Sequence, residues 1–444
     1  MKPLKRRNPA FGLALCLGAA LFIFGGDPGR GLPKPGPGDR QFPGGKLPAE
    51  YAPGEVLVKF KESAGAAVRA SILESRGSRV VSRIGPLDVT VAGIKSGASV
   101  EETAALLRQD PTVEYAEPNY VYRIALTPND KYFEYQYALS NRGQAIGWAP
   151  DSLLGTPGAD IKATAAWEET QGKDGVIIGI IDTGVDLTHP DLRNKIIGSG
   201  RDFYDNDFDA SDDHGHGTMV AGVAAAESDN DEGIAGVAWN CKILPVKVLS
   251  RFGAGYEDII AQGIIWAVDN GASVLNLSWG GPEAGETLRL AVKYAYDKNV
   301  FVTAAAGNEN TAVFYPAAFD DTTCAVAATD CNDQRTTWSN FGPEIDVAAP
   351  GEKIVTTFPV SLTDPKLPPY VMNAWGTSIA SAHVAGLAAL IKSVKPWLKP
   401  AEIRAIIRYS ADDVNAGLYK GKDDFIGYGR INMERALVPL KVKK

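Results

Sequence analysis

The strongest constraint on the fold is a series of short, continuous apolar runs in the C-terminal two thirds of the sequence. We predict these runs to be strands at 176–181, 243–248, 274–277, 300–304 and 324–328. Segments of helical character lie between them at 217–226, 257–270 and 284–298. Such alternation is typical of a mostly parallel sheet with helices on both faces. We therefore predict an α/β domain whose functional residues lie at the carboxyl ends of the strands.

A smaller domain is predicted to precede this one. Its expected strands lie at 55–60, 89–94 and 112–116, and its expected helices at 64–76 and 99–109. Ser99 followed by Glu102 is the pattern of a capping box, which supports the start of the second helix. The predicted order is strand, helix, two strands, helix and strand, which indicates a split β-α-β unit of the ferredoxin-like α+β type.

The extreme N-terminus resembles an export signal. Four basic residues precede an apolar run at 10–24, which is short for a membrane span. The residues after this run do not form a small-x-small cleavage site, so an uncleaved anchor is the alternative to a cleaved signal. The predicted organisation is a signal at 1–25, a Pro/Gly-rich linker at 26–53, the small domain at 54–124 and the large domain at 125–444.

Charge and cysteine content exclude some classes of protein. The formal net charge is −8, and residues 126–444 carry 28 basic against 41 acidic side chains, which argues against a nucleic-acid partner. After the signal only Cys241, Cys324 and Cys331 remain, so a complete disulfide framework is excluded. Cys324 and Cys331 flank a predicted strand that holds them too far apart to bond, so we expect buried free thiols.

Three side chains lie at the predicted carboxyl ends of strands or at the starts of the helices that follow, where functional residues of parallel sheets usually lie. Asp182 ends the first predicted strand of the large domain, and His216 and Ser378 each follow a glycine-containing turn at the start of a predicted helix. Alone, each has an ordinary structural explanation as a strand-end cap, a turn residue or a helix N-cap. Together they supply a nucleophile, a base that removes its proton, and a carboxylate that fixes the tautomer of the base.

The motifs at 180–184, 214–222 and 376–380 resemble those of the subtilisin-like serine proteases, and of their thermitase-like members in particular. They occur in that family's order, Asp, His and Ser. The resemblance covers residues 126–444 and implies a catalytic triad of Asp182, His216 and Ser378. Asn308, in the segment 305–308, resembles the family's oxyanion residue and would act with the backbone N–H of Ser378.

The same resemblance implies substrate-binding segments. An extended peptide would pair between two of them as an added strand. The implied residues are Gly253, Ala254, Gly255, Ser278, Trp279 and Gly280. Phe314 stands where the family places the base of the pocket for the side chain preceding the cut, which predicts a shallow apolar pocket. Ile379 replaces the Met that usually follows the nucleophile, and Met219 and Ala382 are further departures from the family pattern.

Acidic residues suggest structural Ca²⁺. An acidic loop precedes the predicted catalytic histidine, and its alternating oxygen ligands suit calcium, although a solvated loop is the alternative. Its candidate ligands are Asp202, Asp205, Asp207 and Asp209. The family resemblance implies a second calcium site at Asp130, Asp191 and Asn230.

Residues 54–124 resemble the family's inhibitory propeptides, with 113–120 as the tail that blocks the cleft. The prediction is a secreted serine endopeptidase, made as a self-processed zymogen. We expect it to be a monomer that is free of the membrane after processing. Protein and peptide substrates and its own propeptide are the expected partners. Two alternatives remain open: a catalytically silent binding protein on a protease scaffold, and a metal-dependent hydrolase that uses the Asp/His-rich loop.

Overall fold

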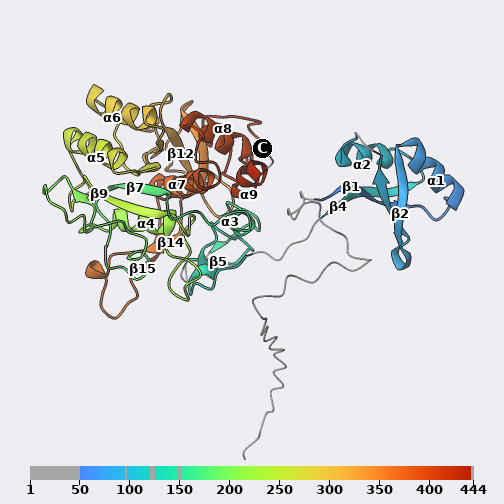
Figure 1. The fold of residues 1–444 in the computed structure, drawn as a ribbon, viewed down its shortest axis with the longest axis horizontal. Helices are drawn as coiled ribbons and strands as arrows, with labels where there is room; N and C mark the ends of the chain where they lie inside the picture. The colour runs from blue at the N-terminus through green and yellow to red at the C-terminus, as the bar shows by residue number, and fades with distance from the viewer. Residues whose placement is uncertain (1–50, 96–97, 121–125, 148–152, 442–444) are drawn as a thin grey trace, which may run out of the picture. The chain divides into compact units, whose positions relative to one another are not determined.

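The computed structural model describes residues 51–95, 98–120, 126–147 and 153–441 (Figure 1). The predicted signal at 1–25 and most of the predicted linker lie outside the described residues. The chain divides into two compact units, Met1–Arg123 and Ile124–Lys444. Strand β1 begins at Tyr51, within the segment assigned to the linker by sequence.

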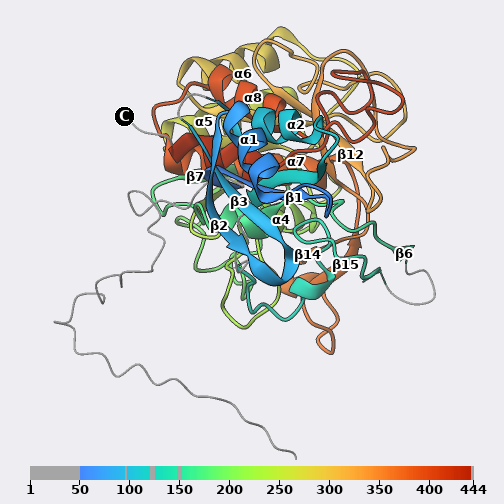
Figure 2. The same ribbon diagram turned by 90° about the vertical axis from the view of Figure 1, so that its right-hand side faces the viewer.

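The N-terminal unit is a four-stranded antiparallel sheet in the order β2-β3-β1-β4. Its elements are β1 (Tyr51–Phe60), α1 (Ala66–Ser75), β2 (Ser78–Ile84), the 3₁₀ turn η2 (Gly85–Leu87), β3 (Val89–Ile94), α2 (Val100–Arg108) and β4 (Val113–Tyr120). Val56, Val58 and Phe60 alternate along β1 and are buried in one apolar core with Leu73 of α1 and Leu107 of α2. Helices α1 and α2 lie beside the strands of this sheet (Figure 2). This order agrees with the predicted split β-α-β unit.

The C-terminal unit is built on a seven-stranded parallel sheet in the order β13-β12-β11-β10-β7-β9-β8. Its strands are β7 (Ile177–Asp182), β8 (Arg201–Asp202), β9 (Lys242–Lys247), β10 (Val274–Leu277), β11 (Phe301–Ala305), β12 (Cys324–Thr329) and β13 (Ile345–Pro350). Two hairpins accompany it, β5 (Ala145–Ile146) with β6 (Leu153–Leu154), and β14 (Ile354–Thr357) with β15 (Tyr370–Ala374).

Helices cover both faces of the sheet, as predicted (Figure 1). The helices are α3 (Ala163–Trp167), α4 (His216–Ala225), α5 (Glu257–Asp269), α6 (Glu286–Asp297), α7 (Thr377–Val394), α8 (Pro400–Ser410) and α9 (Met433–Leu437). The short 3₁₀ turns are η3 (Phe133–Tyr135), η4 (Val360–Leu362) and η5 (Val438–Lys441). Helices α4 and α7 pack into one apolar core, and α5 and α6 pack into another on the opposite face.

Helix α7 is the central element of the C-terminal unit. All of its residues except Val394 are buried, and it contacts β10, β11, β12 and β13. Among the described residues it is the one helix long and apolar enough to cross a membrane, but its burial marks it as a core helix of this unit. Cys241, Cys324 and Cys331 are buried and free, which confirms the predicted thiol state.

Candidate active site

The parallel sheet places the three predicted catalytic side chains as the sequence suggested. Asp182 is the last residue of β7, His216 is the first residue of α4, and Ser378 is the second residue of α7. His216 and Ser378 line one open cleft of about 340 Å³, together with Thr183, the neighbour of Asp182. The fold therefore gathers residues that are far apart in the chain at one end of the sheet.

Asp182 and His216 form a hydrogen-bonded pair. Nδ1 of His216 lies 2.7 Å from Oδ1 of Asp182, which also accepts from the backbone N–H of Thr183 at 2.8 Å. Asp182 is fully buried, so its charge acts on the ring with little screening by water. Burial lowers the pKa of His216, but the charge and hydrogen bond of Asp182 and the charge of Asp212 outweigh it, so the net pKa is raised. A proton on Nδ1 leaves Nε2 available as a base.

Ser378 lies in the same cleft, but its hydroxyl is turned away from the histidine. Oγ of Ser378 donates to the backbone carbonyl of Ser278 at 2.8 Å. In the described part of the chain no hydrogen bond joins Ser378 to His216. Proton transfer between them therefore requires the hydroxyl to turn, and catalytic hydrogen bonds often tighten only when substrate is bound.

Two hydrogen-bond donors lie close to Gly376: the side-chain amide of Asn308 and the backbone N–H of Ser378. Oδ1 of Asn308 accepts from the N–H and from the hydroxyl of Thr377, both at 2.9 Å, which orients the amide and leaves Nδ2 free. A Cβ atom added to Gly376 would lie 3.5 Å from Nδ2 of Asn308 and 3.6 Å from the backbone N of Ser378. Both donors thus face one small region, which Gly376 keeps open, and the start of α7 adds its positive dipole end.

The predicted substrate segments are only partly confirmed as lining the cleft. Gly253, Ser278, Trp279, Gly280 and Phe314 line it, whereas Ala254 and Gly255 do not. A Cβ atom at Gly255 would lie 2.2 Å from the backbone oxygen of Val248, so this glycine allows two backbones to approach.

The half-buried ring of Phe314 lies inside the cleft between two glycines. A Cβ atom added to Gly307 would lie 3.0 Å from Cδ2 of this ring, and one added to Gly280 would lie 3.2 Å from Cβ of Phe314. The two glycines therefore leave room for Phe314, because a side chain at either position would come into close contact with it.

Four polar residues that line the cleft are absent from the predicted site: Thr183, His214, Glu309 and Thr377. His214 lines it, and Nδ1 of His214 accepts from the backbone N–H of His216 at 3.3 Å. Glu309 also lines it, and its carboxylate accepts from the backbone N–H of Asn308 at 2.7 Å. All four lie inside or directly beside a predicted catalytic motif, and that position was the signal available in the sequence.

The predicted calcium ligands near the start of the unit lie close together. Asp191 accepts from Nδ2 of Asn230 at 3.2 Å and from the backbone N–H of Ile234 at 2.8 Å. Oδ2 of Asp130 accepts from the backbone N–H of Asp229 at 2.9 Å, but Oδ1 is buried without a hydrogen-bond partner. Burial, reinforced by neighbouring charges that include Asp191, raises the pKa of Asp130 to about 6. The orphaned oxygen is one that a hard cation would satisfy.

The acidic loop before α4 is arranged differently. Oδ1 of Asp202 accepts from two backbone N–H groups of the loop, and Asp207 and Asp209 each accept from the residue two positions ahead. These are local turn contacts, and Asp205, Asp207 and Asp209 are exposed. No three His, Cys, Asp or Glu side chains of the described residues are grouped to hold a metal ion. Calcium binding by this loop stays a prediction.

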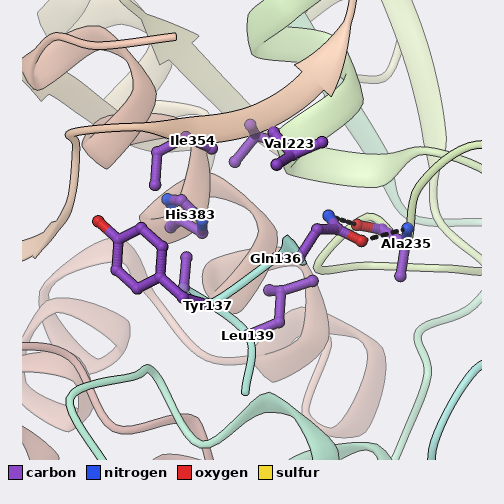
Figure 3. A pocket seen from close by; sticks show the side chains of 9 residues that line it. Gln136, Tyr137, Leu139, Val223, Ala235, Ile354 and His383 are labelled. Atoms are coloured by element: carbon purple, nitrogen blue, oxygen red, sulfur yellow. Dashed lines mark hydrogen bonds between the residues drawn. The ribbon is translucent and has the colours of Figure 1, made fainter. Parts of the chain in front are cut away.

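Two further hollows lack catalytic groups. A water-sized cavity of about 10 Å³ lies beside His383, and the paired hydrogen bonds between Gln136 and Ala235 form part of its wall (Figure 3). Burial lowers the pKa of His383 to about 4, so this histidine stays neutral inside the core. An apolar cleft of about 680 Å³ is larger than the catalytic one, but neither Ser nor His is among the described residues that line it.

Comparison with known proteins identifies the family. Residues 173–429 match the subtilase family, and residues 44–119 match the fervidolysin N-terminal prodomain. A thermophilic serine proteinase from Bacillus sp. (strain AK1) is 41% identical over 388 residues, which are 87% of this chain and 88% of that protein. Thermitase from Thermoactinomyces vulgaris is 41% identical over 313 residues, which are 70% of this chain and 99% of thermitase.

A solved structure supports the same conclusion about the fold. A protease from Pseudoalteromonas arctica PAMC 21717 aligns with a TM-score of 0.61 and 31% sequence identity, covering 71% of this chain and 100% of that one. The family match, the two relatives and the parallel sheet agree with one another. The chain therefore belongs to the subtilase family and is a subtilisin-like serine protease with an N-terminal prodomain.

Proposed function

We propose that this protease is an endopeptidase that uses Ser378 as nucleophile, His216 as general base and Asp182 as the residue that orients His216. One observation carries the proposal. Within a single cleft, His216 is hydrogen-bonded to a buried carboxylate, and Ser378 stands at a helix start beside the free amide of Asn308. A nucleophile, an oriented base and oxyanion donors are the parts that acyl transfer requires.

The reaction would begin when the hydroxyl of Ser378 turns from the carbonyl of Ser278 toward Nε2 of His216. The histidine takes the proton as Oγ attacks the peptide carbonyl, and it later gives that proton to the leaving amine. Asp182 stabilises the imidazolium that forms in between. Nδ2 of Asn308 and the N–H of Ser378 would donate to the oxyanion of the tetrahedral intermediate.

Substrates would bind as extended peptides. The segment at Ser278, Trp279 and Gly280 lines the cleft and would offer backbone groups to the peptide, and Gly253 lines the same cleft. Pairing through backbone hydrogen bonds reads few side chains, which favours broad specificity. Because Phe314 fills part of the cleft, we propose that the pocket preceding the cut is shallow and prefers Ala, Leu or Met.

The prodomain suggests that the enzyme is made as a zymogen. We propose that residues 54–124 inhibit the catalytic domain within the same chain, and that the catalytic domain at 125–444 removes them itself. The basic and apolar N-terminus suggests export, so the mature enzyme would act outside the cell as a monomer.

Structural calcium is part of the proposal at one site. Asp130, Asp191 and Asn230 would hold the ion, which supplies positive charge to two buried carboxylates. The unpartnered oxygen of Asp130 supports this assignment. Asn230 presents its amide nitrogen to Asp191 in this structure, so its side chain would have to rotate to offer an oxygen.

A fluorophosphonate probe, which phosphonylates activated serines with loss of fluoride, tests the proposal. The mature wild-type enzyme should be labelled and inactivated at stoichiometric amounts, and Ser378→Ala should not be labelled. The Asn308→Ala variant should be labelled at Ser378 but slowly. A catalytically silent scaffold would resist the probe in every form, and a metal-dependent hydrolase would lose activity to a chelator but not to the probe.

A further inference from the structure

Asp212 belongs to none of the predicted catalytic or metal-binding sets, yet it is the most heavily hydrogen-bonded carboxylate of the acidic loop. It is buried with only 4% of its surface exposed, four residues before His216. Five donors surround it, and all are backbone N–H groups or threonine hydroxyls of the protein itself. A carboxylate saturated in this way has no free oxygen for a cation, so its role differs from that of a calcium ligand.

Four of the five hydrogen bonds bracket His216 on both sides. Oδ1 of Asp212 accepts from the backbone N–H groups of His214 at 3.0 Å and Gly215 at 2.8 Å, just before the histidine. Oδ2 accepts from the N–H of Thr218 at 2.9 Å and from its hydroxyl at 2.7 Å, just after it. One rigid side chain therefore fixes the backbone of the turn that presents the imidazole.

The fifth hydrogen bond reaches the neighbouring strand. The buried hydroxyl of Thr183 donates to Oδ1 of Asp212 at 2.8 Å and accepts from the N–H of Gly217 at 3.0 Å. Thr183 directly follows Asp182 at the end of β7. The carboxylate of Asp212 thus connects the two backbone segments that carry the members of the Asp182–His216 pair.

The charged groups around His216 come from several elements. Asp182 faces it from β7, and Asp212 faces it from the loop before α4. His214 lies beside it with ring centroids 6.3 Å apart, and Glu309 lines the same cleft. The ammonium group of Lys247 donates to the carbonyl of Thr183 and pairs with Asp213. Asp182 and Asp212 are the two charges that raise the pKa of His216.

We propose that Asp212 is a positioning residue of the catalytic site, which holds His216 and Asp182 in register and adds a second negative charge beside the imidazole. This inference rests on the proposed role of His216 as general base. An Asn at this position keeps the shape but not the charge, and it presents an NH₂ group where Asp212 accepts hydrogen bonds, so it would strain the turn.

The test compares Asp212→Asn with Asp186→Asn. Asp186 is also buried, and it accepts from the N–H and hydroxyl of Thr188 and from the N–H of Val360, but it does not act on His216. The two variants therefore share the loss of a buried capping carboxylate. Each is produced as the full chain, matured to completion, and assayed for fluorophosphonate labelling rate and for kcat and KM on a peptide from pH 5 to pH 10.

We expect Asp212→Asn to lower kcat and the labelling rate about tenfold to hundredfold with little change in KM, because a small misplacement of the base affects the chemical step. The acid limb of both pH profiles should move to lower pH, because removing a negative charge makes His216 easier to deprotonate. Asp186→Asn should lower stability while leaving the acid limb in place.

Thr183→Val separates position from charge and does not depend on Asp212→Asn folding. It removes the bridge to β7 but leaves the carboxylate, so labelling should slow while the acid limb stays at its wild-type pH. The inference is overturned if Asp212→Asn labels at the wild-type rate with an unshifted acid limb, or if its whole loss lies in KM. Labelling of Ser378→Ala would instead overturn the proposed function, so the two failures can be told apart.

Discussion

The two units of this chain bury their apolar surface in different ways. The prodomain packs α1 and α2 on one face of four antiparallel strands, and its edge strand β2 exposes Val80 and Val81 by 43% and 50%. The catalytic unit buries β7, β10, β11, β12 and β13 between two apolar cores. A small one-sided core is marginally stable, whereas parallel strands joined by crossovers are stable but form slowly. We therefore expect the prodomain to fold rapidly, and the catalytic unit to be the more stable of the two and to carry the active site.

The largest expected effect comes from removing the nucleophile, which should leave the two units joined. In subtilisin, loss of the catalytic serine lowers kcat about 10⁶-fold, and this measured value sets the expectation for Ser378→Ala. The variant should accumulate as an uncut precursor, whereas the wild type should be cut near 125–127. Gel mobility and N-terminal sequencing measure the outcome. Normal maturation of the purified variant would show that the chain does not process itself.

The uncut Ser378→Ala precursor also allows both units to be melted in one molecule. Adding Leu73→Ala should destabilise the prodomain by about 2–5 kcal/mol, because Leu73 is 1% exposed in its small core. Calorimetry should then show the prodomain transition lost and the catalytic transition retained. Leu106, on the other helix and 42% exposed, is the matched control, and Leu106→Ala should change little. A single cooperative transition that shifts as a whole would show that the two units do not unfold independently.

Chemistry should be separable from stability inside the catalytic unit. Removal of an oxyanion asparagine lowers turnover by about 10²–10³-fold in a member of this family, so Asn308→Ala should do the same. Its melting temperature should stay near that of the wild type, since the side chain bonds only Thr377 among the described contacts. Steady-state kinetics and calorimetry measure the turnover and the melting temperature. A loss of activity that is accompanied by a much lower melting temperature would contradict the prediction.

Calcium should strengthen only the larger unit. Binding to the native state adds about 2.7 kcal/mol at a hundredfold excess over Kd. Chelation should therefore lower the catalytic transition and leave the prodomain transition unchanged. Asp130→Asn should melt at the same temperature with and without calcium if this site is the important one. An unchanged wild-type melting temperature after thorough chelation would contradict both the proposed calcium site at Asp130, Asp191 and Asn230 and the predicted one in the acidic loop.

The smallest effect concerns selectivity. If the ring of Phe314 blocks the pocket that precedes the cut, Phe314→Gly should gain on substrates with Phe or Tyr at that position, by about 1–3 kcal/mol in relative kcat/KM. Phe252→Gly is the control, because Phe252 lines the same cleft but is 76% exposed. A peptide library read by mass spectrometry measures both variants. Equal gains in the two would show that Phe314 does not define the pocket.

Elements with simple apolar patterns could be predicted from the sequence. The five predicted strands of the catalytic unit lie within one residue of those observed, because each is a continuous apolar run between helices. Strands β8 and β13 of the seven-stranded sheet were not predicted. Strand β13 carries Asp346 in its interior, and that buried charge is tolerated because Arg404 and Arg408 pair with it from α8. Such long-range compensation leaves no local signal in a sequence.

The residues of the candidate site likewise differ in whether the sequence could predict them. Asp182, His216 and Ser378 could be proposed as the triad because their motifs are local and occur in a known order. Asp212 could not be singled out, since in sequence it is one of several acidic residues in a loop, and only folding shows that its donors include the distant Thr183. The inward position of Phe314 likewise depends on Gly307 and Gly280, which only the fold brings next to it.

The burial of α7 also affects how heat would inactivate the enzyme. Ser378, the proposed nucleophile, lies in the first turn of a helix that is buried along almost its whole length, so we expect this helix to open only together with the rest of the domain. Its amides should exchange with solvent only through global opening. Loss of activity on heating should then be all-or-none for each molecule, with a half-life governed by the unfolding rate rather than by gradual loosening of the active site.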